Sequence, residues 1–243
     1  MKLRLTYILL LLLCSLSACH RGYYMQKQSS NIYAIDKAVN ADSSMADMIT
    51  PYKQNMQQAM EQVIGTNDTM LTKGQPESSL GNFLADAQLD AAKKADAGVI
   101  ASVANYGGIR LPYITAGPIT IGKMYELMPF DNTIVILDVP GNVMLEFCNH
   151  IANLGGWPVS GIRFAIKDKQ AIDIEIGNAP LDTGKTYKIA VNDYMAGGGD
   201  KCSFLKTLKP KPVNVFVRDA LIAYVRQQQT LRASLAKRIY YAQ

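Results

Sequence analysis

Apolar residues recur along this chain with two different spacings, and segments of the two kinds interleave. Four segments place apolar side chains every three or four residues, as one face of a helix does, at residues 49–63, 80–91, 143–154 and 217–225. Five shorter runs are rich in β-branched residues, as strands are, at residues 98–103, 133–139, 159–166, 171–176 and 187–191. Because some strand runs follow one another without a helix between them, the order predicts a single α+β domain in which helices pack against a mixed β-sheet.

Two local signals place the starts of helices. Pro51 lies near the start of the first helical segment, where a missing amide hydrogen costs little. Ser78 and Ser79 precede the second segment and are candidate N-caps. The chain has 243 residues, of which 49% are hydrophobic and 19% charged, so it has enough apolar material for a sizeable core. This composition excludes a disordered, collagen-like or coiled-coil chain.

One continuously apolar stretch lies near the N-terminus, which excludes a membrane protein with many spans. Lys2 and Arg4 precede an apolar run at residues 8–13 that is too short to span a bilayer, so residues 1–18 are predicted to be a secretory signal. Leu16-Ser17-Ala18-Cys19 resembles the lipobox of bacterial lipoproteins, which implies that Cys19 is lipidated and anchors the chain to a membrane. A plain signal peptide or a short anchor helix is the alternative.

The remaining chain is expected to comprise a lipidated tether at residues 19–43 and a folded domain at residues 44–243. The tether lacks a sustained apolar periodicity, as linkers do. The predicted location is therefore the bacterial cell envelope, as a membrane-anchored lipoprotein on the periplasmic or surface side. Acyl chains contribute about 0.8 kcal/mol per buried CH₂, so several of them would hold the protein firmly while its domain stays in water.

The net charge and the cysteines indicate which partners and which disulfide are to be expected. Removal of residues 1–18 takes away Lys2 and Arg4 and no acid, so the net charge falls from +5 to +3. Without a basic run or a nucleic-acid-binding motif, no nucleic-acid partner is expected. Cys148 and Cys202 could form one disulfide, but the apolar helical pattern around Cys148 favours two buried thiols.

Histidine is too scarce for most hydrolytic sites. Its two occurrences are His20, in the tether, and His150, in a helical segment. A zinc or dinuclear site built on several histidines cannot be assembled from them, and GxSxG, Walker A and CxxC sequences are absent. His150 is expected to be a surface or packing residue. No catalytic residue, metal ligand or cofactor is therefore assigned to this chain, although an all-carboxylate site stays open.

Three polar loops at the ends of strand runs contain the candidate binding residues. The first holds Asn105 and two glycines before Arg110, whose forked guanidinium suits a phosphate. The second offers an aromatic ring and an amide, Phe130 and Asn132, a combination that suits a nucleobase. The third, residues 192–200, contains a second ring and a carboxylate, at Tyr194 and Asp200. Each loop alone is also compatible with an ordinary turn.

The ordered set of motifs resembles the C-terminal domain of the 5′-nucleotidase and UDP-sugar hydrolase family over residues 44–241. The motifs are NxGGIR from Asn105, PFxN from Pro129, Val159-Ser160-Gly161, and NDYxAxGGD from Asn192. Glu77-Ser78-Ser79-Leu80-Gly81-Asn82 and Gly117-Pro118-Ile119-Thr120 also resemble segments of that domain. The resemblance implies substrate-binding roles for Asn105, Arg110, Phe130, Asn132, Gly161, Tyr194 and Asp200.

Within that resemblance, Phe130 and Tyr194 would sandwich the base, Arg110 would approach the phosphate, and Asp200 would bind the ribose hydroxyls. The chain departs from the family at Lys73-Gly74-Gln75-Pro76, where further arginines are usual, so Lys73 could act as a substitute charge. It also departs by containing no N-terminal metallophosphoesterase domain, the part that holds two divalent metals and hydrolyses the ester.

The leading hypothesis is therefore the nucleotide-recognition half of a split 5′-nucleotidase-type hydrolase in nucleotide catabolism. It binds base and ribose, while a separate metallophosphoesterase polypeptide supplies the metals and the attacking water. The alternative is a non-catalytic nucleoside- or nucleotide-binding envelope lipoprotein, and a third hypothesis is an envelope scaffold with an inactive pocket. The residues do not distinguish AMP, UMP, a cyclic nucleotide or a UDP-sugar as the ligand.

Overall fold

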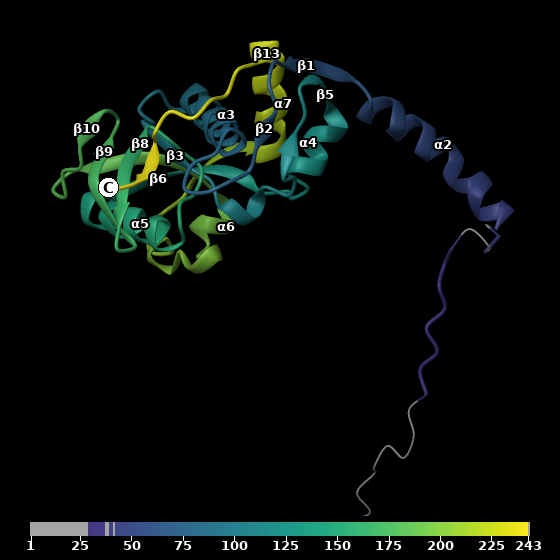
Figure 1. The fold of residues 1–243 in the computed structure, drawn as a ribbon, viewed down its shortest axis with the longest axis horizontal. Helices are drawn as coiled ribbons and strands as arrows, with labels where there is room; N and C mark the ends of the chain where they lie inside the picture. The colour runs from purple at the N-terminus through teal and green to yellow at the C-terminus, as the bar shows by residue number, and fades with distance from the viewer. Residues whose placement is uncertain (1–28, 37–38, 41, 243) are drawn as a thin grey trace, which may run out of the picture. The chain divides into compact units, whose positions relative to one another are not determined.

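A computed structural model of the chain describes residues 29–36, 39–40 and 42–242. The predicted signal segment and Cys19 lie outside the described residues. Contacts divide the chain into two units, Met1–Met48 and Ile49–Gln243. In the first unit, the described residues before Ser43 are exposed and contain neither helix nor strand. The second unit holds the strands and every helix that begins after residue 60 (Figure 1).

The elements follow one another in an irregular order of helices and strands. The α-helices are α2 (Ser43–Met60), α3 (Ser79–Ala95), α4 (Ile121–Leu127), α5 (Gly141–Asn153), α6 (Asp193–Ala196) and α7 (Val217–Gln228), and the 3₁₀ turns are η1 (Tyr106–Gly108), η2 (Gly199–Lys201) and η3 (Ser203–Leu205). The strands are β1 (Val63–Asn67), β2 (Leu71–Thr72), β3 (Ala101–Val103), β4 (Tyr113–Ile114), β5 (Gly117–Thr120), β6 (Thr133–Pro140), β7 (Val159–Ser160), β8 (Ile162–Lys167), β9 (Gln170–Ile176), β10 (Ala179–Pro180), β11 (Thr186–Asn192), β12 (Lys211–Phe216), β13 (Thr230–Leu231) and β14 (Ile239–Tyr241).

A five-stranded sheet in the order β12-β6-β11-β3-β7 forms the centre of the second unit. Strand β11 pairs in parallel with β3 and antiparallel with β6, so the sheet is mixed. Both of its faces are covered. Along β6, Ile134 and Ile136 belong to one hydrophobic cluster, and Val135, Leu137 and Val139 belong to the other. Burial on both faces explains why this strand reads as a continuous apolar run rather than an alternating one.

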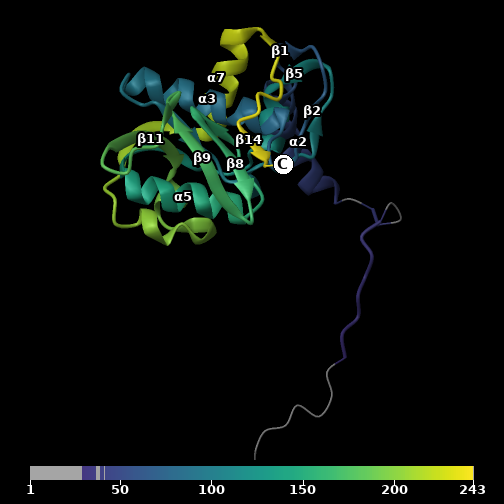
Figure 2. The same ribbon diagram turned by 60° about the vertical axis from the view of Figure 1, so that its left-hand side comes forward.

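Helices α3, α4 and α7 build the cluster on one face, and α5 with a second sheet builds the cluster on the other (Figure 2). The second sheet has the order β10-β9-β8-β14 and is also mixed. A three-stranded sheet, β13-β1-β5, lies beside α7 and α4, and β2 pairs with β4. The predicted α+β class, with helices packed on mixed strands, is confirmed, although the strands form several sheets instead of one.

Three of the four predicted helices agree closely with α3, α5 and α7. The Ser78 side chain caps α3 by accepting a 3.1 Å hydrogen bond from the backbone N–H of Gly81. The prediction for residues 49–63 was wrong at both ends. Helix α2 begins at Ser43, so Pro51 lies inside it, and Val63 belongs to β1. None of the α2 residues is buried, so its apolar spacing does not reflect packing within the described residues.

The predicted strand at residues 159–166 is two strands separated by Gly161. Strand β7 pairs with β3 in the five-stranded sheet, whereas β8 pairs with β9 in the other sheet. Gly161 has a φ of +72°, and a Cβ at this position would collide with the carbonyl oxygen of Ile100. Because a side chain is strained in this conformation and has no space, glycine is required where the chain passes between the sheets.

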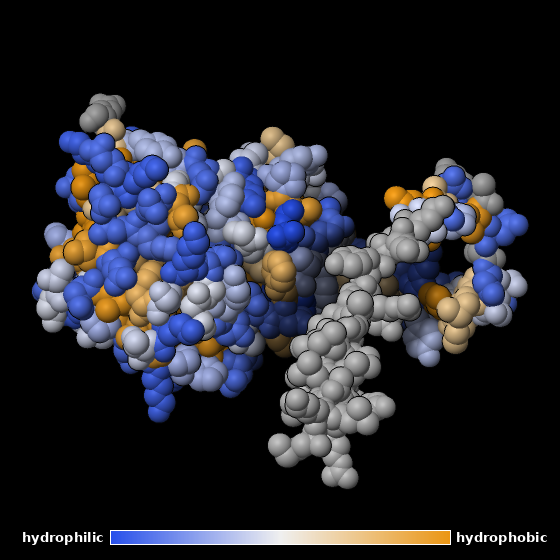
Figure 3. Space-filling model, turned by 90° about the horizontal axis from the view of Figure 1, so that it is seen from below, coloured by the Kyte–Doolittle hydropathy of each residue, from blue (hydrophilic) through white to orange (hydrophobic). Residues whose placement is uncertain are grey.

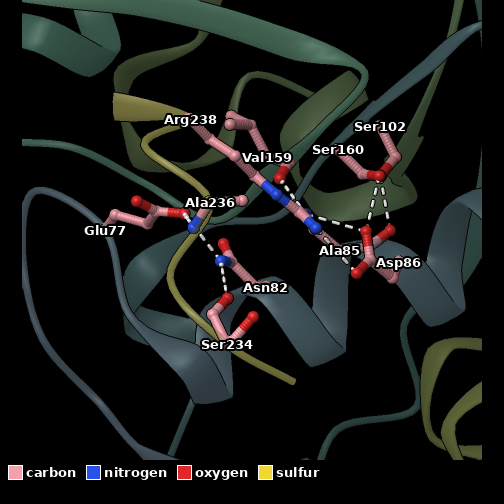
Figure 4. Close-up of polar contacts among 10 residues, drawn as sticks. All are labelled: Glu77, Asn82, Ala85, Asp86, Ser102, Val159, Ser160, Ser234, Ala236 and Arg238. Carbon is pink, nitrogen blue, oxygen red and sulfur yellow. Dashed lines mark hydrogen bonds and ion pairs between the residues drawn. The ribbon is translucent and has the colours of Figure 1, made fainter. Parts of the chain in front are cut away.

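The segment after α7 is fixed to the domain by a polar cluster (Figure 4). The Arg238 guanidinium donates to both carboxylate oxygens of Asp86, at 2.7 and 2.8 Å, and to the carbonyl of Val159 at 2.7 Å. The Ser160 hydroxyl donates to the same carboxylate at 2.6 Å. One turn earlier on α3, Asn82 donates to the carbonyl of Ser234 at 2.8 Å. These contacts join the last strand, β14, to α3 and β7.

Hydrophobic residues are scattered among hydrophilic ones on the face of the second unit that Figure 3 presents. Such single exposed apolar residues are normal for a folded domain in water. Among the described residues, no helix is long and apolar enough to cross a membrane.

Candidate functional site

The topology brings the three polar loops to the same edge of the five-stranded sheet. Strands β3 and β11 are parallel, so both end at this edge, and β6, antiparallel to β11, begins there. The last residue of β11, Asn192, is paired with Ile134 near the start of β6. The loop after β3, the loop before β6 and the loop after β11 therefore meet, as carboxyl ends of neighbouring strands do in many binding folds.

These loops enclose a cavity of about 360 Å³, within the size range of ligand pockets. Six of the seven residues predicted to bind substrate line it, together with Gly107 and Gly108: they are Asn105, Arg110, Phe130, Asn132, Tyr194 and Asp200. Phe130 and Tyr194 keep 38% and 47% of their surface exposed, which leaves their rings accessible to a ligand. The Arg110 guanidinium lies 5.8 Å from the centre of the Phe130 ring.

Gly161 is the predicted site residue that does not line this cavity. It lies in a separate surface depression with Ser160, Glu175 and Arg238. The structure instead gives it the role of the turn between the two sheets, because of its positive φ and its approach to Ile100. Its presence in the motif thus has a backbone explanation that does not involve a ligand.

Asp200 is held at the floor of the cavity by side chains from two of the loops. Its carboxylate accepts a 2.7 Å hydrogen bond from the Asn105 amide and a 3.2 Å hydrogen bond from the Tyr194 hydroxyl. Asn105 in turn accepts from the amide of the buried Asn192 at 2.9 Å. Asp200 has a φ of +48° and a ψ of +37°, a left-handed conformation that is uncommon outside glycine. Its carboxylate is therefore oriented before any ligand binds.

The position of the Tyr194 ring depends on a neighbouring glycine. A Cβ at Gly199 would lie 2.5 Å from ring atoms of Tyr194, so the ring lies directly on the backbone of residue 199. The Tyr194 hydroxyl also accepts a 3.3 Å hydrogen bond from the backbone N–H of Asp200. The glycine run after Tyr194 thus allows close contact between ring and backbone, one of the uses of glycine in binding loops.

A second positively charged side chain, Lys73, lies close to Arg110 beside the first loop. Lys73 donates a 2.8 Å hydrogen bond to the carbonyl of Ile109 and lies 4.1 Å from the centre of the Tyr106 ring. The pKa of Lys73 is lowered, mainly because burial removes water from its ammonium group and also because Arg110 is close. The two cations therefore adjoin, although Lys73 does not line the cavity.

The loop that carries Phe130 is fixed by an arginine that the sequence did not indicate. Arg218, which is 8% exposed, donates to the carboxylate of Asp131 at 3.0 Å and to the carbonyl of Phe130 at 3.4 Å. Its guanidinium also lies 4.1 Å from the centre of the Tyr125 ring. A side chain from α7 thus fixes the backbone that presents Phe130 to the cavity.

His150 packs as predicted, but it also reaches the site. Its ring contacts Trp157 and Phe204 edge-on, with centroid distances of 5.3 and 5.5 Å. Its Nε2 atom lies 3.0 Å from the backbone carbonyl oxygen of Asp200. Neither this contact nor the Asn192 contact has a local sequence signal, because both join segments far apart in the chain.

The predicted thiol state of the two cysteines is confirmed, because Cys148 and Cys202 are both free and buried. Burial raises the pKa of each thiol to about 12, with the nearby Asp200 charge contributing at Cys202. Within the described ranges, no group of three or more histidine, cysteine, aspartate or glutamate side chains could hold a metal ion.

Comparison with known proteins relates this cavity to a family. A family model described as the 5′-nucleotidase C-terminal domain matches residues 57–207. The trifunctional nucleotide phosphoesterase protein YfkN of Bacillus subtilis is 31% identical over 196 residues, which cover 72% of this chain and 13% of YfkN. Protein UshA of Escherichia coli is 27% identical over 221 residues, which cover 86% of this chain and 38% of UshA. The chain thus spans less than two fifths of the length of these two relatives.

A solved structure gives the same assignment. The crystal structure of a 5′-nucleotidase precursor from Thermus thermophilus matches with a TM-score of 0.70 and 29% sequence identity, over 85% of this chain and 45% of that one. The structure of the NAD nucleotidase of Haemophilus influenzae matches with a TM-score of 0.66 at 18% identity, which supports the fold alone. The sheet-edge cavity thus lies in a fold shared with nucleotidases, and the chain belongs to the family that carries the 5′-nucleotidase C-terminal domain.

Proposed function

We propose that the sheet-edge cavity binds a nucleotide, with the base between Phe130 and Tyr194, the ribose hydroxyls on Asp200 and the phosphate toward Arg110. The observation that carries this proposal is the meeting of two accessible rings, an oriented carboxylate and a guanidinium at one cavity. Each group suits one part of a nucleotide: ring faces stack on bases, a carboxylate accepts hydrogen bonds from hydroxyls, and a guanidinium pairs with phosphate oxygens.

The two rings would supply most of the affinity. Stacking on an aromatic side chain contributes about 1–3 kcal/mol per base in nucleic-acid systems, and it tolerates different bases. The carboxylate would add selectivity for a sugar with hydroxyl groups. Lys73 would raise the positive potential beside Arg110 without itself entering the cavity, which fits the departure from the family's usual arginines.

In the fuller form of the proposal, this chain is the recognition half of a split 5′-nucleotidase-type hydrolase. A separate metallophosphoesterase polypeptide would hold the divalent metals that activate the attacking water. A nucleotide fixed by base and ribose would present its phosphate ester to that partner, so that binding energy is used for orientation. The support is that residues 57–207 match the 5′-nucleotidase C-terminal domain and that a relative, YfkN, is named a nucleotide phosphoesterase.

The cell envelope, with a lipid anchor at Cys19, is the proposed location. A relative from Listeria monocytogenes, 33% identical over 147 residues, is named a cell wall protein, which supports an envelope location. Mass spectrometry of the protein purified from membranes tests the anchor, because a lipidated Cys19 would be the first residue of the mature chain. A mature chain that starts elsewhere and carries no lipid would refute it.

Calorimetry with the full chain tests nucleotide binding directly, using AMP, adenosine and UDP-glucose without added metal. Tyr194→Ala should weaken binding by about tenfold, as expected for the loss of one stacking ring. Tyr241→Ala is the matched control, because it removes an exposed tyrosine, 59% exposed, from β14 in the other sheet. Equal affinities for the wild type and the Phe130→Ala/Tyr194→Ala double variant would instead favour the scaffold with an inactive pocket.

Mixing the chain with its metallophosphoesterase partner tests the split arrangement. The expected result is a higher rate of nucleotide hydrolysis than with the partner alone, and no gain would refute this part of the proposal. The alternative is a nucleoside- or nucleotide-binding protein without a catalytic partner. It predicts nucleotide binding without co-purification of a metallophosphoesterase.

A further inference from the structure

His150 lies outside the cavity, yet it contacts the backbone of the residue that forms the cavity floor. It belongs to the last turn of α5, and its Nε2 atom lies 3.0 Å from the carbonyl oxygen of Asp200. A backbone carbonyl can only accept a hydrogen bond, so this contact requires a hydrogen on Nε2. The ring is held in place by edge-on contacts with Trp157 and Phe204.

The carbonyl that His150 contacts belongs to a backbone in an uncommon conformation. Asp200 and the next residue, Lys201, both have positive φ angles, +48° and +65°. Such conformations are unfavourable for residues other than glycine and persist where surrounding contacts hold them. Besides His150, the thiol of Cys202 approaches this oxygen at 4.0 Å, a longer and weaker contact. The His150 hydrogen bond is thus the stronger of the two at this carbonyl.

The orientation of the carbonyl determines where the carboxylate of the same residue points. On the cavity side, that carboxylate is shared by Asn105 at 2.7 Å and Tyr194 at 3.2 Å. On the opposite side, His150 holds the peptide group. If the peptide group turned, the carboxylate would move away from the cavity and from the Tyr194 hydroxyl. The Tyr194 ring would still lie on the backbone of Gly199, and Phe130 belongs to a different loop, so stacking would be affected less than ribose binding.

We infer that His150 is a positioning residue for ribose recognition, which acts by fixing the backbone of Asp200 so that its carboxylate faces the ligand. This inference rests on the proposed nucleotide-binding function. It makes the ribose, rather than the base or the phosphate, the part of the ligand whose recognition depends on His150. A residue that served packing alone would affect all parts of the ligand equally.

The test measures the affinity of the full chain for AMP and for 2′,3′-dideoxy-AMP, which lacks both ribose hydroxyls. His150→Phe keeps a planar ring between Trp157 and Phe204 but removes the donor. His150→Gln is the matched control, because its amide nitrogen can donate from a similar position. We expect His150→Phe to weaken AMP binding about tenfold, because the ribose would lose a hydrogen bond to the charged Asp200 carboxylate. Dideoxy-AMP makes no such bond, so its affinity should stay within about twofold. His150→Gln should restore most of the AMP affinity.

Each other outcome has a distinct meaning. A parallel loss for both nucleotides in His150→Phe would overturn the inference in favour of a packing role. Wild-type protein that binds both nucleotides equally would also overturn it, while nucleotide binding itself would stand. Wild-type protein that binds neither would overturn the proposed function. If His150→Phe fails to fold, the inference is tested by determining which ring nitrogen of His150 carries the hydrogen in the wild type. The sequence contains two histidines, so its ring signals are readily assigned by NMR, and a hydrogen on Nδ1 with none on Nε2 would refute the inference.

Discussion

The contact between Arg238 and Asp86 should stabilise the fold more than any exposed ion pair of the chain's C-terminal segment. Substituting methionine for Arg238 retains an unbranched apolar stem of similar packing but removes three hydrogen bonds, two to the carboxylate of Asp86 and one to the carbonyl of Val159. The two side chains are 19% and 28% exposed, so water reaches them only in part. Asp86 keeps the hydroxyl of Ser160 as its remaining donor.

The expected loss in the free energy of unfolding follows from the intermediate burial of this ion pair. Breaking a fully buried ion pair costs about 3–5 kcal/mol, whereas exposed pairs contribute about 0–1 kcal/mol. Because the Asp86 carboxylate is partly hydrated, we expect Arg238→Met to lower the free energy of unfolding by about 2–3 kcal/mol. Arg232→Met is the matched control. Arg232 pairs with Asp68 at 3.0 Å in the same segment, but the side chains are 79% and 48% exposed, so its loss should cost less than about 0.5 kcal/mol.

Urea unfolding followed by fluorescence provides the assay, because the chain has one tryptophan, Trp157, which is 5% exposed and belongs to the core. A double-mutant cycle with Asp86→Asn isolates the pair, and it should give a coupling energy above about 1 kcal/mol. Equal losses for Arg238→Met and Arg232→Met would refute the reasoning, since the difference in burial would then have no energetic effect. Additive losses in the cycle would refute it as well.

Two further predictions concern the site and the response to acid. Gly199→Ala should weaken nucleotide binding about tenfold in calorimetry, because its methyl group would displace the Tyr194 ring that stacks on the base. Gly74→Ala, whose added carbon stays at least 3.7 Å from its neighbours, should leave binding unchanged, and equal effects would contradict the explanation. The pKa of Asp96 is about 2 instead of its ordinary 3.8, chiefly because the Lys188 ammonium donates to it at 2.9 Å. The stability that the Asp96 carboxylate contributes is therefore fully present above pH 3.8 and is lost as the pH falls toward 2. In Asp96→Asn, the urea concentration at the unfolding midpoint should fall less between pH 3.8 and pH 2 than in the wild type. An equal fall in both proteins would be evidence against this.

Features determined by local sequence could be predicted for this fold. The apolar spacing of α3, α5 and α7 and the apolar run of β6 can be read from consecutive residues, because each element buries one or both of its own faces. The Ser78 cap is a contact within three residues. Six of the seven predicted binding residues could be named because they lie in loops that immediately flank strand runs. Parallel and antiparallel pairing then brought those loops to one edge.

The remaining features depend on contacts between distant segments. Helix α2 carries an amphipathic pattern without burying a residue, so its ends were not set by packing and were predicted wrongly. The chain changes sheets at Gly161, which a run of β-branched residues cannot indicate. Arg218 and His150 support the site from α7 and α5, and only the tertiary fold relates them to Phe130 and Asp200.

The polar floor of the cavity has one consistent direction of hydrogen bonding. The backbone N–H of Met195 can only donate, so it fixes the Asn192 side-chain oxygen as its acceptor at 2.8 Å. The Asn192 amide nitrogen must then donate to the Asn105 oxygen, which turns the Asn105 amide nitrogen toward the Asp200 carboxylate. Because each amide is oriented by the preceding one, neither can rotate to offer an oxygen to the ligand without breaking a contact that is at least partly buried. Of this hydrogen-bonded chain, the Asp200 carboxylate is the group left to respond to the ligand, so substitutions at Asn192 or Asn105 should alter ligand preference through Asp200.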